Sequence, residues 1–160
     1  HIGSFSKTIS PALRLGFMVA PPELSRRFAE LAASLAPAPA AGMQRAVAEF
    51  LRDGHYLRHL RRMKRLYAAR REALLRCLGE MAPDSIKIRA TAGLAVVISL
   101  PKSASDVEIA SRALEFSLAP APMSAWYTQP PRQQGLLLCV TNLDERRLPA
   151  DCRRLLELAR

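Results

Sequence analysis

One long helical pattern divides this chain into two parts of different character. From about Gly54 to Met81, apolar residues recur at the 3.6-residue period of a helix. The apolar stripe consists of Tyr56, Leu60, Met63, Tyr67, Leu74, Leu78 and Met81, while Arg58, Arg61, Arg62, Arg65 and Arg76 face away from it. The pattern therefore predicts a helical spine that leads into a second unit.

Proline and glycine mark the ends of the elements before this helix. Pro21-Pro22 closes an apolar run, Pro37-Ala38-Pro39 ends a helix, and Asp53-Gly54 precedes the spine. Proline has these effects because it lacks an N–H and disfavours helix in the residue before it. The expected elements are a strand, a turn and a second strand in residues 1–20, a helix at about 23–35 and a helix at about 42–52.

In the sequence after the long helix, the pattern becomes typical of an α+β fold. Ser105-Asp106-Val107-Glu108 has the arrangement of a capping box, which predicts a helix start, and Pro149 suits the first turn of a last helix. The remaining expected elements are an alternating strand at 86–88, a buried strand at 94–100, a helix ending near Phe116, a turn at 119–122 and a buried strand at 136–140.

The formal charge of +10 raises the question of nucleic-acid binding. Much of the basic excess lies on the long helix, and the chain shows neither a helix-turn-helix pattern nor aromatic residues interleaved with the basic ones. We therefore expect the arginine face to be solvated or to form a subunit contact, and DNA to be contacted only through another domain.

Cysteine and histidine patterns argue against a disulfide framework and a metal centre. Cys77, Cys139 and Cys152 are too few and too scattered for disulfides, which favours a reducing cytoplasm. His55 and His59 have a spacing that can bind metal on a helix, but no third ligand accompanies them and the surrounding arginines repel a cation. No apolar stretch is long enough for a membrane span.

A short segment near the start of the chain carries the chemistry. Gly3-Ser4-Phe5-Ser6-Lys7-Thr8 is followed by Arg14, on a turn between apolar runs. A lysine amine can form a Schiff base with an aldehyde when it is neutral, because only the neutral amine is nucleophilic. The hydroxyls of Ser4 and Ser6 and the guanidinium of Arg14 can hold a phosphate through charge-assisted hydrogen bonds. The grouping suits an aldehyde cofactor that carries a phosphate.

This segment resembles the lysine segment of class I/II aminotransferases, which are fold-type I enzymes dependent on pyridoxal 5'-phosphate. Within that superfamily the chain is most similar to the aminotransferase-like domain of MocR-type transcriptional regulators, in which a GntR-type winged helix-turn-helix precedes the cofactor-binding domain. The stretches that carry the resemblance are 3–21, 44–51, 54–67, 70–75, 124–127 and 135–138.

The resemblance implies a fold, a cofactor and a role. It implies an α+β fold of the α/β family, with residues 1–35 as the end of the large cofactor-binding domain and residues 36–160 as the small C-terminal domain. Lys7 would bind pyridoxal 5'-phosphate as a Schiff base, and Ser4, Ser6 and Arg14 would face its phosphate. In a regulator the cofactor would serve to sense an amino-acid-like effector, and the protein would be a homodimer.

Some features of the family are missing or altered here. The groups that bind the cofactor ring come from the part of the large domain ahead of the lysine. The C-terminal strand lacks the arginine that usually binds the substrate carboxylate, which leaves Arg132 as the nearest candidate and Tyr127 as a possible neighbour of the active-site mouth. Cys139 stands where the branch commonly has glycine, and Ala95 where histidine is frequent. These differences put transamination in doubt.

Two other functions stay open at this point. A free-standing aminotransferase would interconvert an amino acid and a 2-oxo acid, and a cofactor-free remnant would serve only as a dimerisation module. We expect the 160-residue chain by itself to be inactive, because the ring-binding groups lie outside it.

Overall fold

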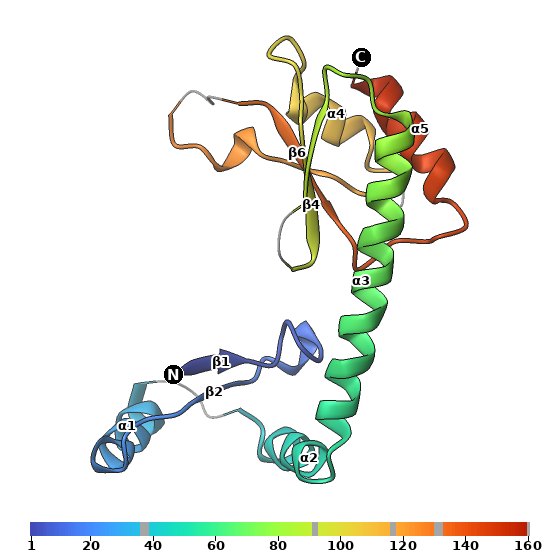
Figure 1. Cartoon of the computed structure of the whole chain (residues 1–160). Coiled ribbons are helices and arrows are strands. Elements are labelled where there is room, and N and C mark those ends of the chain that lie inside the picture. Colours follow the sequence, from blue (N-terminus) through green and yellow to red (C-terminus); the bar gives the residue numbers. More distant parts are fainter. Residues whose placement is uncertain (36–38, 91–92, 116–117, 130–132, 160) are drawn as a thin grey trace. The chain divides into compact units, whose positions relative to one another are not determined.

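The computed structural model describes residues 1–35, 39–90, 93–115, 118–129 and 133–159. The chain forms two compact units, His1–Met63 and Lys64–Arg160 (Figure 1). Helix α3 (His55–Met81) contributes its first part to one unit and its second part to the other.

The first unit begins with a small antiparallel hairpin. Strands β1 (Ile2–Ser4) and β2 (Gly16–Met18) pair with Gly3 opposite Phe17. The segment that connects them contains the 3-10 turn η1 (Pro11–Leu13). A Cβ atom on Gly3 would lie only 2.3 Å from the Phe17 ring, so glycine lets the aromatic ring cover the backbone of β1. Helices α1 (Pro22–Leu35) and α2 (Ala41–Arg52) follow.

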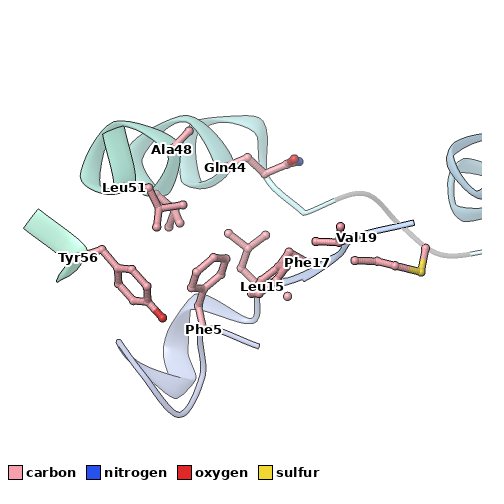
Figure 2. Close-up of a pocket in the computed structure, with 11 residues that line it drawn as sticks. Phe5, Leu15, Phe17, Val19, Gln44, Ala48, Leu51 and Tyr56 are labelled. Atoms are coloured by element: carbon pink, nitrogen blue, oxygen red, sulfur yellow. The ribbon is translucent and has the colours of Figure 1, made fainter. Parts of the chain in front are cut away.

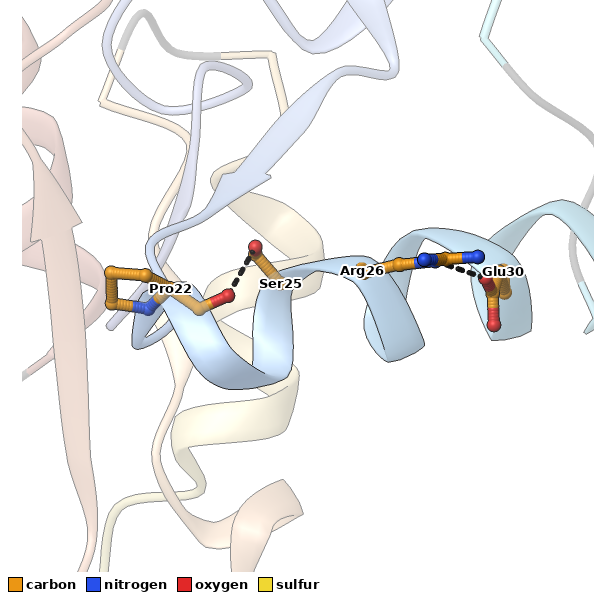
Figure 3. Close-up of polar contacts among 4 residues, drawn as sticks. All are labelled: Pro22, Ser25, Arg26 and Glu30. Atoms are coloured by element: carbon orange, nitrogen blue, oxygen red, sulfur yellow. Dashed lines mark hydrogen bonds and ion pairs between the residues drawn. The ribbon is translucent and has the colours of Figure 1, made fainter.

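The core of this unit is small. Phe5, Leu15 and Val47 are buried together, and Tyr56 is among the half-buried side chains that pack on them. No residue of α1 is buried, although its Leu24, Phe28, Leu31 and Leu35 recur at helical spacing. Local contacts hold α1 instead, including the 3.0 Å ion pair between Arg26 and Glu30 and the Ser25 hydroxyl bond to the Pro22 carbonyl (Figure 3).

The second unit is built on a four-stranded antiparallel sheet. Its strands are β3 (Lys87–Ala90), β4 (Ala95–Ser99), β5 (Ala121–Pro122) and β6 (Gly135–Cys139), in the order β3-β4-β6-β5. Helices α4 (Asp106–Arg112) and α5 (Leu148–Leu158) and the second part of α3 supply the helical side of its core.

The sheet buries alternate residues. Val96 pairs with Leu138 and Ile98 with Leu136, and all four side chains are fully buried, whereas Val97 and Leu137 between them are half-exposed. The apolar run at 94–100 predicted a buried strand, and β4 has no exposed residue. Its most deeply buried face is that of Val96 and Ile98, because the helices that form the core with this sheet cover that face.

Two corrections concern short elements. Residues 119–122 were expected to form only a turn, but Ala121–Pro122 forms an edge strand, a place that tolerates proline because one side of an edge strand needs no N–H donor. The helix start predicted at Ser105 is confirmed, since the Ser105 hydroxyl accepts the Glu108 N–H, but α4 ends at Arg112. Its expected end at Phe116 lies outside the described residues.

A buried carboxylate joins three segments of this unit. Asp106, which is fully buried, accepts hydrogen bonds from the backbone N–H groups of Ser124 at 2.8 Å and Gly135 at 3.1 Å, and from the Ser124 hydroxyl. It thereby ties the start of α4 to β6 and to the 3-10 turn η2 (Ser124–Trp126).

The apolar stripe of α3 is used unevenly. Leu74 and Leu78 are fully buried in the second unit, together with Cys77, while the earlier stripe residues Leu60 and Met63 are half-exposed. Burial beside Cys77 raises the pKa of the Cys152 thiol above its ordinary range, so these thiols act as core side chains. Within the described part of the chain, no helix has the length and apolar character of a membrane span.

Candidate functional site

The turn that displays Lys7 is organised by Phe5. The Phe5 carbonyl accepts the N–H groups of Thr8 at 3.2 Å, Ile9 at 2.8 Å and Ser10 at 3.3 Å, and the Phe5 ring is buried. One carbonyl with three donors closes a tight turn around residues 6 and 7. Because the ring anchors the turn in the core, Lys7 is directed to the surface, where it is exposed.

The sequence candidates lie on neighbouring backbone. The Ser4 hydroxyl accepts the Ser6 N–H at 3.1 Å, which fixes these two serines on either side of Phe5. The Phe5 N–H donates to the Leu15 carbonyl at 3.0 Å, and this bond brings Arg14 beside the turn. The structure therefore brings the backbone positions of Ser4, Ser6, Lys7 and Arg14 together in the first unit.

Arg14 has an unusual backbone conformation. Its φ of 50° and ψ of 31° lie in the left-handed region, and its N–H caps the turn η1 by donating to the Pro11 carbonyl. The left-handed region costs a residue with a Cβ atom about 1–2 kcal/mol. Such an outlier often marks a functional position, where the surrounding structure holds a side chain in place at an energetic cost.

The donors of this site suit a phosphate. Two hydroxyls, a guanidinium and an amine supply only neutral or positively charged polar groups, and residues 1–22 contain no aspartate or glutamate that would repel an anion. The residues present therefore fit a phosphorylated aldehyde cofactor, with a phosphate among the hydroxyls and the guanidinium and an aldehyde at the lysine.

Helix α3 supports the turn from behind, through contacts that the sequence did not reveal. The Tyr56 hydroxyl lies 3.1 Å from the Thr8 hydroxyl, and His59 Nε2 lies 2.9 Å from the Thr8 carbonyl. Because a carbonyl oxygen only accepts, His59 Nε2 carries the proton. Tyr56 and His59 are three residues apart, and this spacing places both on one face of the helix, which is the only sign of a shared role in the sequence. Their common partner Thr8 is about fifty residues away in sequence.

An apolar groove adjoins the turn within the first unit. It has a volume of about 560 Å³ and is lined by Phe5, Leu15, Phe17 and Tyr56, among others, with Gln44, Ala48 and Leu51 from α2 (Figure 2). Its lining is mostly apolar, so it provides a hydrophobic wall beside the polar turn.

Of the two candidates for substrate binding, Tyr127 lies in the described part of the chain. Tyr127 belongs to the second unit, where it ends the turn η2 and its side chain is exposed. Arg132 lies outside the described residues. The structure therefore adds no geometric support for either residue as a substrate ligand.

Two differences from the branch pattern are direct neighbours. Ala95 on β4 pairs with Cys139 on β6 across the sheet. The Cys139 sulfur lies 3.1 Å from the Thr141 hydroxyl.

His55 and His59 make other contacts than metal ligation. His55 Nδ1 accepts from an Arg58 guanidinium nitrogen at 2.7 Å, and His59 binds the Thr8 carbonyl. In the described ranges, no group of three or more histidine, cysteine or acidic side chains is arranged to hold a metal ion.

Comparison with known families decides the classification. The model of the family "Aminotransferase class I and II" matches residues 1–141. This chain belongs to that family. The resemblance seen in the sequence is thereby confirmed.

Among the relatives of this aminotransferase-family chain are regulators and enzymes. It is 31% identical over 145 residues to a probable rhizopine catabolism regulatory protein MocR of Rhizobium meliloti, covering 90% of this chain and 29% of that protein. It is 30% identical over 156 residues to a 2-aminoadipate transaminase of Thermus thermophilus, covering 97% of this chain and 39% of that enzyme. The chain thus spans well under half of either relative.

The fold is that of solved aminotransferases. The structure of LysN, an α-aminoadipate aminotransferase from Thermus thermophilus, superposes with a TM-score of 0.81 at 29% identity over 99% of this chain and 41% of that one. That crystal structure contains N-(5'-phosphopyridoxyl)-L-leucine. The multiple substrate aminotransferase of Thermococcus profundus has a TM-score of 0.82 at 24% identity, over 99% of this chain and 40% of that one. The α+β fold expected from the sequence is confirmed.

Proposed function

We propose that this chain is the C-terminal part of a pyridoxal-phosphate-binding, aminotransferase-like domain of a transcriptional regulator. The observation that carries the proposal is the acid-free turn that brings Ser4, Ser6, Lys7 and Arg14 together. Regulators among the relatives, such as the MocR protein of Rhizobium meliloti, support the regulatory role.

Each residue of the turn has a distinct task in this proposal. When bound, pyridoxal phosphate supplies an aldehyde that reacts with amines and a ring that withdraws electrons. Lys7 provides the amine that holds the aldehyde carbon. Ser4, Ser6 and Arg14 bind the phosphate, and Tyr56 and His59 hold the turn through Thr8. The ring-binding groups come from outside this chain.

In this proposal, regulation depends on an effector that binds two conformations of the protein with different affinities. An amino-acid-like effector that competes with Lys7 for the aldehyde would favour one conformation of the protein over another, and this bias would pass to a separate DNA-binding domain. In this proposal the protein is a cytoplasmic homodimer, with residues 1–35 closing the large domain and residues 36–160 forming the small one.

A free-standing aminotransferase is the second candidate. It is favoured by the 30% identity to the 2-aminoadipate transaminase over nearly the whole chain. Against it stands β6, whose residues Gly135–Cys139 include no arginine for a substrate carboxylate. The third candidate, a cofactor-free dimerisation module, predicts that Lys7 has no chemical role.

A covalent-labelling experiment tests the proposal in the full-length protein that contains this chain. After incubation with pyridoxal phosphate and reduction with borohydride, peptide mass spectrometry should find the cofactor on Lys7. Lys7→Arg keeps the positive charge but removes the reactive amine, so it should abolish labelling, while the matched variant Lys64→Arg on α3 should not. Labelling that persists in Lys7→Arg would exclude Lys7 as the anchor, whereas the absence of specific labelling in the parent protein would favour the third candidate.

An activity measurement separates the regulator from the enzyme. The regulator hypothesis predicts that an amino compound changes DNA affinity without sustained conversion of a 2-oxo acid. Multiple turnovers of amino transfer in the labelled protein would favour the aminotransferase.

A further inference from the structure

The first unit has another pocket besides the apolar groove. It lies where the end of α2 meets the start of α3, and its lining is largely polar. It has a volume of about 280 Å³, and the side chains that line it are Phe50, His55, Arg58, His59 and Arg62. No acidic residue lines it. None of the five belongs to the donor set of the Lys7 turn, so the pocket is a separate feature.

Aromatic and hydrogen-bond contacts hold one side of this pocket in place. The Phe50 and His55 rings stack with their centroids 5.8 Å apart and an angle of 13° between their planes. Arg58 Nη2 donates to His55 Nδ1 at 2.7 Å, which leaves Nε2 as the proton-bearing nitrogen of a neutral His55 ring. His59 is fixed by its bond to the Thr8 carbonyl. The wall is therefore formed before any ligand binds.

The charges of this pocket are arranged unfavourably for the helix that carries them. Arg58 and Arg62 are four residues apart on α3, and like charges at this spacing destabilise a helix. Arg58 also lies in the first turn of the helix, where the dipole favours anions, and residues 54–71 contain no acidic side chain. Among the ion pairs of the described residues, none involves Arg58 or Arg62. An anion bound between the two guanidiniums would relieve this repulsion.

We propose that this pocket binds a phosphate group, as inorganic phosphate or as a small phosphate monoester. Guanidinium groups bind tetrahedral oxyanions through paired, charge-assisted hydrogen bonds, and the exposed Arg62 has its donors available for this. The stacked wall of Phe50 and His55 gives an attached organic group an apolar surface. The site does not depend on the cofactor hypothesis, since none of its lining residues is a candidate ligand of the cofactor.

Histidine signals provide a site-resolved test. The chain has three histidines, of which His55 and His59 line the pocket and His1 does not. Inorganic phosphate is added to the 160-residue chain at fixed pH and ionic strength, and the imidazole signals are followed by NMR, with sodium chloride as the matched salt. We expect saturable shifts at His55 and His59 with phosphate, and little change at His1 or with chloride.

Two matched variants assign the shifts to the pocket. Arg62→Gln should raise the dissociation constant for phosphate about tenfold or more, because it removes a charge-assisted contact. Arg61→Gln makes the same charge change one residue away, outside the pocket, and should alter the constant less than twofold. Repeating the titration in Arg14→Gln, where the other candidate phosphate site is impaired, should leave the His55 and His59 shifts unchanged. Far-UV circular dichroism confirms that each variant is folded.

A last titration compares inorganic phosphate with a phosphate monoester. Glycerol phosphate should compete with inorganic phosphate at the same signals. Shifts that do not saturate, that chloride reproduces, or that Arg61→Gln and Arg62→Gln weaken equally would overturn the discrete site. Binding of an oligonucleotide that both variants weaken equally, without binding of free phosphate, would identify an extended polyanion surface instead.

Discussion

Arg14 links backbone strain to ligand binding at the level of a single residue. Its left-handed conformation suits glycine better than arginine, yet in our proposal its guanidinium binds the cofactor phosphate. Strain and binding therefore make opposite demands on this position, and substitutions can separate them.

Variants of Arg14 should move stability and affinity in different directions. Arg14→Gly should stabilise the first unit by about 1 kcal/mol, because it relieves the left-handed strain. Both Arg14→Gly and Arg14→Ala should lower cofactor affinity in the full-length protein by roughly one to two decades, since each loses a contact worth about 1.5–3 kcal/mol. Arg14→Lys should recover only part of this, because a point charge cannot replace the fork of the guanidinium.

Thermal unfolding and cofactor titration check this prediction. If all three Arg14 variants bind the cofactor as the parent does, Arg14 is a surface residue whose conformation has another cause.

Tyr56 tests whether α3 positions the lysine turn. Tyr56→Phe keeps the ring, which meets the Phe5 ring edge-on at a centroid distance of 5.8 Å, but removes the hydroxyl bond to Thr8. We expect the amides of Thr8, Ile9 and Ser10 to exchange hydrogen several-fold faster, because a hydrogen bond of this kind contributes about 0.5–1.5 kcal/mol. Tyr67→Phe on the same helix is the matched control and should leave these amides unchanged. Unaltered exchange in Tyr56→Phe would show that the Phe5 carbonyl holds the turn by itself.

At the scale of elements, Asp106 decides how the second unit responds to acid. Burial by itself raises the pKa of its carboxyl, but the hydrogen bonds from the Ser124 hydroxyl and from the N–H groups of Ser124, Gly135 and Val107 together lower that pKa below its ordinary value of 3.8. A carboxyl with a lowered pKa in the folded state stabilises the fold fully above its unfolded pKa, and this contribution is lost as pH falls through the folded pKa.

The acid response of Asp106 is therefore a testable difference. Asp106→Asn should lower the free energy of unfolding at neutral pH by about 2 kcal/mol or more, because an amide cannot satisfy the same set of N–H donors. Below about pH 4 the parent should lose stability as pH falls, while Asp106→Asn should lose less. Urea unfolding at several pH values measures both effects, with the exposed Asp84→Asn as the control. Parallel pH profiles for the parent and Asp106→Asn would contradict this assignment.

Element boundaries followed from local patterns, whereas the contacts between elements did not. The long helix expected at 54–81 was found at His55–Met81, and the last helix at Leu148–Leu158, because periodicity and proline act within a few residues. Strand β5 was missed because its two residues carry no pattern of their own and pair only with Leu136 and Leu137. The opposition of Ala95 and Cys139 depends on sheet register, which a single strand does not specify.

For the candidate site, the sequence predicted a group of neighbouring residues but not the contacts that support them. Ser4, Ser6, Lys7 and Arg14 lie within about ten residues, so their grouping was visible as a motif. The bonds of Tyr56 and His59 to Thr8 join segments about fifty residues apart, and only the packing of the first unit brings them together. Their chemical roles remain proposals that the labelling and exchange experiments test.

At the scale of the whole molecule, the exposed apolar surface of the first unit governs behaviour in solution. Leu24, Phe28 and Leu31 of α1 are 41%, 40% and 54% exposed, and Met18 and Val19 beside Phe28 are 47% and 61% exposed. Contiguous apolar surface of this kind favours association. We expect the 160-residue chain to self-associate through α1 and the β2 edge.

A pair of charge substitutions on α1 tests this expectation. Leu31→Glu places a carboxylate in the apolar stripe and should shift the chain toward the monomer at a given concentration, because association would have to desolvate that charge. Ala33→Glu adds the same charge on the opposite face of α1 and should leave the assembly unchanged. Light scattering over a range of concentrations measures the mass of each species. A parent chain that stays monomeric at every concentration, with α1 still helical, would mean that its apolar stripe is tolerated in water and that the association surface lies elsewhere.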